Sequence, residues 1–98
     1  MLKNQLKHKH MTQVLTPELE EKYIAAATDY ATRWNSPDPH VIRIIQSVMM
    51  HRDDVLRGGG FVEAVVNNQL LQAVSRADQT CYANLKVIVS AREYCYID

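Results

Sequence analysis

Few residues in this chain have the type and spacing that chemistry requires. His51 stands just before the acids Asp53 and Asp54, and a histidine beside carboxylates can ligate a metal ion when further ligands join it. The next histidine, His40, lies eleven positions upstream, which is too far along one helix for the two to share an ion. Ligand number and spacing therefore predict no metal site, and we interpret this segment as the solvated end of a helix.

The three glycines of the chain form one stretch, Gly58–Gly60. A glycine-rich stretch before a helix can bind phosphate through its backbone N–H groups. This one lacks the Gly-Lys-Ser/Thr ending of a Walker loop, and no strand precedes it as in a dinucleotide site. Glycine is common at the left-handed position that follows a helix. We therefore expect one of these glycines to end a helix within a flexible turn.

Two cysteines, Cys81 and Cys95, are the remaining candidate nucleophiles. On one helix their fourteen-residue separation corresponds to about 21 Å along the axis, beyond the reach of a disulfide. No histidine accompanies them in that part of the chain, so neither has an evident base. We expect both to be reduced core residues. The sequence thus predicts no catalytic, metal-binding or cofactor-binding residue, no cofactor and no enzymatic activity.

Proline and capping residues predict the first two helices. Thr16 can cap a helix that begins at Pro17, and the segment 35–39 ends it because its two prolines cannot continue a helix. Asp38 can cap a second helix that begins at Pro39. The apolar face of this second helix is broad, which predicts a central position touched from two sides.

The segment after the glycines contains no glycine and no proline, and its apolar residues recur every three or four positions. The stripe consists of Val62, Val66, Leu70, Ala73, Val74, Ala77, Cys81, Leu85, Ile88, Ala91 and Cys95. This register predicts one long helix and disfavours a strand at 87–89. From Phe61 to Tyr96 it would be about 54 Å long, which exceeds a domain with a radius of gyration of about 13 Å. Two alternatives stay open: a bend near Asp78, or a projection toward a second copy.

We therefore expect an all-α fold, a small three-helix arrangement with a long C-terminal helix, over residues 16–98, after a basic flexible arm at 1–15. Lys+Arg and Asp+Glu number 11 each, but three lysines lie in the arm, so the remainder carries a net charge of −3. A mildly acidic body disfavours nucleic-acid binding. No apolar run is long enough to cross a membrane, and we expect a cytoplasmic protein.

One face of the predicted long helix, opposite the apolar stripe, is polar but almost uncharged. A purely solvated helix face usually carries many charges, whereas amides, hydroxyls and a tyrosine suit a specific protein interface. We therefore predict a partner-binding row. It consists of Asn68, Gln72, Ser75, Gln79, Tyr82 and Lys86.

These features favour a non-enzymatic protein-binding module, a small inhibitor, adaptor or regulator of a larger complex, which is a build common among phage and prophage accessory and anti-defence proteins. Its partner would be another protein, and a homodimer through the long helix is a further expectation. The alternative is a nucleic-acid-associated transcriptional regulator. It would use the basic arm and a helix-turn-helix-like element whose second helix begins at Phe61.

Overall fold

The computed structural model describes residues 15–36 and 38–94, and within these ranges the chain is helical, with no strand. The helices are α1 (Pro17–Arg33), α2 (Pro39–Arg52), α3 (Gly60–Val66), α4 (Leu70–Arg76), α5 (Gln79–Ala83), α6 (Leu85–Ser90) and the 3₁₀ helix η1 (Ala91–Glu93). The all-α prediction is confirmed for this part of the chain. The predicted arm, apart from its last residue, and Cys95 lie outside the described ranges.

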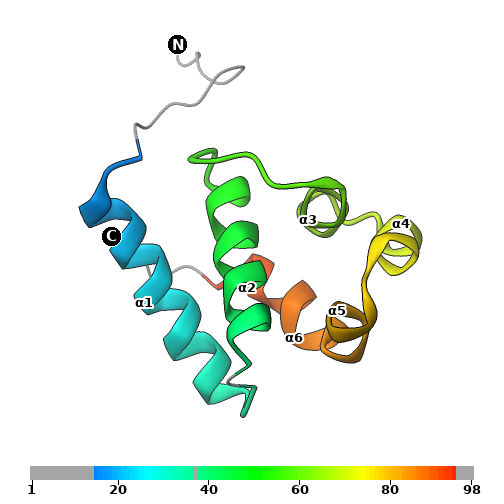
Figure 1. The fold of residues 1–98 in the computed structure, drawn as a ribbon. Helices are drawn as coiled ribbons and strands as arrows, with labels where there is room; N and C mark the ends of the chain where they lie inside the picture. The colour runs from blue at the N-terminus through cyan, green and yellow to red at the C-terminus, as the bar shows by residue number, and fades with distance from the viewer. Residues whose placement is uncertain (1–14, 37, 95–98) are drawn as a thin grey trace.

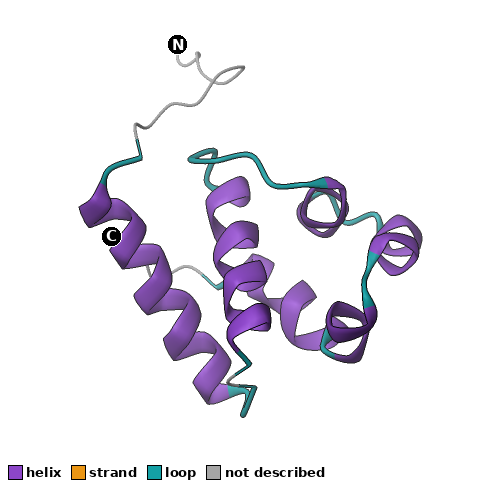
Figure 2. Cartoon of the chain, in the orientation of Figure 1, coloured by secondary structure: helices purple, strands orange, loops and turns teal. Residues whose placement is uncertain are grey.

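The two predicted helix starts are present. Thr16 caps α1, its hydroxyl accepting a hydrogen bond from the N–H of Leu19 at 3.1 Å, and Asp38 caps α2 by accepting from the N–H of His40 at 2.8 Å. The two helices lie side by side, and α3 to α6 lie on the other side of α2 (Figures 1 and 2). The central position predicted for α2 is therefore confirmed.

The core is built around α2. Four of its side chains have no exposed surface: Val41, Ile45, Val48 and Met49. On one side α1 covers them with small residues, Ala27 and Ala31 among them, which let the two helices approach closely. On the other side lie α3, α5, α6 and η1. Removal of this apolar surface from water is the main favourable contribution to folding.

The prediction of one long C-terminal helix is wrong, because three interruptions divide this part of the chain into short helices. Asn68 adopts a left-handed conformation (φ 60°) and ends α3. Ala77 is extended, and Asp78 then caps α5 by accepting a hydrogen bond from the N–H of Cys81 at 2.7 Å. Asn84 separates α5 from α6. The apolar register did not reveal these breaks, because each short helix also buries at least one residue of the stripe: Val62, Ala73, Cys81 or Ile88.

Three helices end in the same way, and none of them uses glycine. Asn35, Asp54 and Asn68 have φ values of 56°, 62° and 60° after α1, α2 and α3. In each case the next N–H reaches back five residues to a helix carbonyl, as in the bond from Val55 to Met50 at 2.8 Å. Asn and Asp tolerate this conformation better than other residues with a Cβ. The prediction that a glycine of 58–60 takes the left-handed position is wrong, since no glycine has a positive φ.

Substitution at Asn68 distinguishes the divided helix from a continuous one. Asn68→Ala should lower the free energy of unfolding by about 1 kcal/mol, because alanine costs roughly 1–2 kcal/mol in the left-handed region, which asparagine tolerates better. Asn68→Gly should keep or raise stability. The control is Asn67→Ala, where φ is −87°. Urea unfolding measures all three, and stabilisation by Asn68→Ala would contradict the break, because alanine favours a continuous helix.

Gly58 and Gly59 form a second matched pair. A Cβ at Gly58 would lie 2.5 Å from Cγ1 of the buried Val62, whereas a Cβ at Gly59 would meet nothing within 4 Å. Gly58→Ala should therefore destabilise the fold by about 1–3 kcal/mol through overpacking. Gly59→Ala should change stability by less than about 1 kcal/mol. Thermal unfolding compares the two, and equal effects would refute the close approach of the loop to α3.

Candidate functional site

The six residues of the predicted partner-binding row are all exposed, but they do not share one helix. Gln72 and Ser75 lie on α4, and the row continues onto α5 and α6 beyond the break at Ala77. Asn68 lies in the turn before α4, and Lys86 of α6 places its ammonium 5.9 Å from the ring centre of Trp34 at the end of α1. The row therefore extends over several elements, and its premise of a single helical face does not hold.

A different surface of α4 is apolar and exposed. The exposed fractions are 62% for Leu70, 80% for Leu71 and 36% for Val74. Leu70 and Val74 were expected in the core, but the left-handed residue before α4 resets the rotation of the chain. Only Ala73 of this helix is buried, and α4 packs chiefly against α3. We call Leu70, Leu71 and Val74 the α4 patch.

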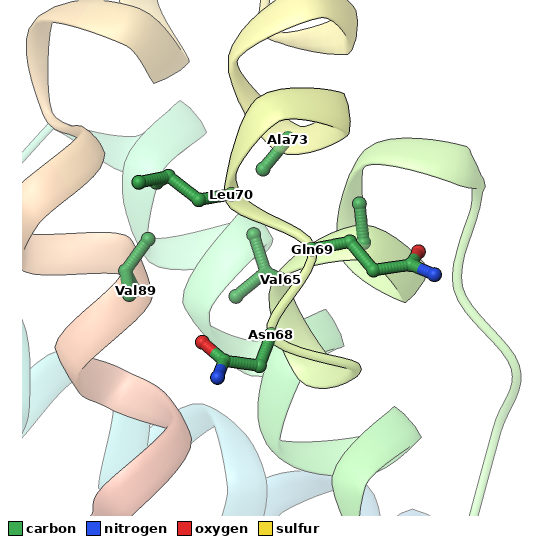
Figure 3. A pocket seen from close by; sticks show the side chains of 7 residues that line it. Val65, Asn68, Gln69, Leu70, Ala73 and Val89 are labelled. Atoms are coloured by element: carbon green, nitrogen blue, oxygen red, sulfur yellow. The ribbon is translucent and has the colours of Figure 1, made fainter.

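A shallow pocket adjoins this patch between α3, α4 and α6 (Figure 3). Leu70 and Val89 point toward each other across it, while the side chain of Gln69 points away. Its cavity volume is about 20 Å³, about the space of one or two water molecules, whereas small-molecule sites have roughly 300–1,000 Å³. The pocket therefore suits a single apolar side chain better than a separate ligand. It is lined by Ala64, Val65, Asn68, Gln69, Leu70, Ala73 and Val89.

The part of the chain that carries the patch has few charges. Between Ala64 and Ala91 the charged residues are Arg76, Asp78 and Lys86. Depletion of charge at an apolar centre is the compositional feature that distinguishes protein interfaces from other surface. The segment that carries the patch is thus depleted of charge, as the centres of protein interfaces are.

The residues His51–Asp54, at the end of α2, form hydrogen bonds with other residues of the protein. The Nδ1 atom of His51 accepts a hydrogen bond from the N–H of Gly58 at 2.9 Å, so this N–H does not face a phosphate. Asp53 accepts from Arg52 and from the hydroxyl of Tyr23. Burial would raise the pKa of Asp53, but these hydrogen bonds outweigh it and lower the pKa below the usual value. These contacts fix the end of α2 and the following loop.

The structure also brings together three residues that sequence spacing kept apart. His40 begins α2, Asp78 caps α5, and Cys81 lies in the first turn of α5. The Nε2 atom of His40 is 3.0 Å from Oδ2 of Asp78, and the possible ligand atoms of all three residues lie within 4.8 Å of one another. The spacing Asp78-x-x-Cys81 is visible in the sequence, but nothing there connects it with His40, 38 residues before Asp78.

Cys81 is not poised as a nucleophile. Burial and the neighbouring Asp78 carboxylate raise the pKa of its thiol to about 11. Activated cysteines have a lowered pKa and an accessible sulfur, whereas Cys81 is buried. With a pKa this high, the thiol of Cys81 is protonated at neutral pH.

Comparison with known proteins identifies no relative, since no protein family, curated protein or solved structure matches the chain. Among the described residues, no helix combines the length and apolar character needed to cross a membrane.

The state of Cys81 can be measured by thiol reactivity. In a Cys95→Ser variant, so that Cys81 is the remaining thiol, reaction with a disulfide reagent at pH 8 should be at least about a hundredfold slower in the folded than in the urea-unfolded protein. An ordinary thiol with a pKa of about 8.5 is about a quarter ionised at this pH, whereas a pKa near 11 leaves about one thiolate in a thousand. Equal rates in the two states would contradict the burial of Cys81.

Proposed function

We propose that this protein is a binding module, an inhibitor, adaptor or regulator, that docks on another protein through the α4 patch. The observation that carries the proposal is the exposure of adjacent leucines, 62% at Leu70 and 80% at Leu71, on a short helix with one buried residue. Isolated exposed apolar residues are ordinary, but a contiguous group beside an apolar pocket marks an interaction site.

Binding at this surface would rest on apolar burial. Full burial of a leucine or valine side chain contributes roughly 1.5–3 kcal/mol, so the three side chains of the patch can supply the centre of an interface. An apolar side chain of the partner would enter the pocket between Leu70 and Val89. The polar residues nearby, such as Gln72 and Ser75, would lie at the rim, where contacts contribute less energy.

Two other expectations receive less support. The homodimer was expected through a long helix, and that helix is divided. As a recognition helix α3 offers little, because Val62, Ala64 and Val65 are buried and Glu63 is its acidic exposed residue. Phosphate contacts of DNA-binding proteins come chiefly from basic and polar groups.

The proposal is tested by a charge at the centre of the patch. Leu71→Asp should reduce capture of the partner from the native cells at least tenfold, since a buried anchor contributes about 2 kcal/mol or more. Leu56→Asp is the matched control, because Leu56 is 47% exposed but lies outside the patch. Circular dichroism and thermal unfolding should show both variants folded. Quantitative mass spectrometry of the captured proteins is the readout.

A third variant separates the patch from the row predicted by sequence. Gln72→Glu combined with Tyr82→Glu changes that row and leaves the patch intact, so we expect capture to fall less than with Leu71→Asp. Retention of capture by Leu71→Asp would refute the proposal. Loss of self-association alone, measured by sedimentation, would identify the occupant of the patch as a second copy and contradict a separate partner.

A further inference from the structure

We propose that His40, Asp78 and Cys81 bind one zinc ion, which joins the start of α2 to the start of α5. The proposal rests on how these residues are placed. His40 is separated from Asp78 by 38 positions in the sequence. The fold nevertheless brings the possible ligand atoms of all three residues within 4.8 Å of one another. It is independent of the protein-binding function.

The ligand atoms are already close to the separations of a tetrahedral site. With zinc–nitrogen and zinc–oxygen bonds of roughly 2.0–2.1 Å, the two atoms would be about 3.3 Å apart. The distance from Nε2 of His40 to Oδ2 of Asp78 is 3.0 Å. The sulfur of Cys81 lies within 4.8 Å of both and would need to approach to about 3.6 Å. A movement of about 1 Å therefore completes the three-ligand set.

Neighbouring hydrogen bonds orient the ligands. Oδ1 of Asp78 accepts from the N–H of Cys81 at 2.7 Å, which leaves Oδ2 directed at His40. A second contact between the same two parts of the chain joins the hydroxyl of Ser36 to Oδ1 of Asn84 at 3.0 Å. The bond to Asp78 orients a ligand atom, as outer-shell hydrogen bonds do in metal sites, whereas the bond from Ser36 joins the two parts of the chain without touching a ligand.

The ligand types favour zinc. A thiolate is a soft ligand that selects zinc over magnesium and calcium, and imidazole with a carboxylate completes a common zinc set. The Cys81 thiol gives its proton to solvent when the sulfur binds, so the ion faces one thiolate, one carboxylate and one neutral imidazole. The charges of Zn²⁺ and its ligands then cancel. The helix dipole opposes a cation only weakly here, because α5 has five residues.

The site is accessible from solvent. The side chain of His40 is 38% exposed and that of Asp78 is 57% exposed, whereas Cys81 is buried beneath them. An ion can therefore reach the two outer ligands and then contact the sulfur. Three protein ligands leave one tetrahedral position, which water would fill.

Zinc titration by calorimetry tests the proposal in a His8→Gln/His10→Gln background, since those two histidines could bind zinc on their own. We expect one ion per chain. Cys81→Ala, His40→Gln and Asp78→Asn should each weaken binding by at least about a hundredfold, since loss even of an outer-shell partner costs roughly 10–100-fold. Asp78→Asn retains an N-cap. Asp54→Asn is the matched control, because Asp54 follows the opposite end of α2 from His40 and its left-handed backbone suits asparagine, so this variant should keep full affinity.

Cobalt(II) supplies a second readout that identifies the sulfur ligand. The background protein should show a thiolate-to-cobalt charge-transfer band, which Cys81→Ala should remove and Cys95→Ser should keep. Thermal unfolding without metal shows whether each variant is folded. If a variant does not fold, the comparison of zinc affinities is made with Asp78→Asn in its place. Equal zinc affinity in Asp78→Asn and Asp54→Asn, or a cobalt complex without the charge-transfer band, would overturn the proposal.

Discussion

The arrangement of this protein depends on the burial of α2 from both sides. Val41, Ile45, Val48 and Met49 have no exposed surface, and no single helix could cover them. The pair α1 and α2 therefore needs the short C-terminal helices as a second wall. Tyr30 of α1 donates its hydroxyl to the carbonyl of Val87 in α6 at 2.6 Å, which joins the N-terminal helices directly to the C-terminal ones.

The sequence predicted the first half of the fold well and the second half poorly, for a physical reason. Thr16 and Asp38 are caps whose side chains act within a few residues, so their roles can be recognised locally. Asn68 ends α3 through a left-handed backbone, and its neighbour Asn67 has the same side chain without that role. Tertiary packing selects between them. A continuous apolar stripe could not reveal the break, because four short helices on one core repeat nearly the same pattern.

The candidate sites, like the helices, could be predicted only where they depend on residues close together in the sequence. The polarity of the predicted partner-binding row was enough to predict that its residues are exposed. The exposure of the α4 patch could not be predicted, because Leu70 and Val74 fit the apolar stripe of the core, and only the break at Asn68 turns them outward. His40 and Cys81 could not be associated from spacing, because their proximity is created by the packing of α5 on α2. Local rules thus describe capping and composition, while sites assembled from distant segments require the fold.

The slight attachment of α4 has a consequence for motion. A seven-residue helix is too short to be stable by itself in water, and α4 buries only Ala73 against the rest of the molecule. Its opening therefore exposes little new apolar surface, and its amide protons should exchange with solvent at a free energy well below that of global unfolding. The helix α4 is thus both weakly attached to the rest of the molecule and rich in exposed apolar side chains. Binding of a partner to the α4 patch and ordering of the α4 backbone would therefore be one coupled equilibrium.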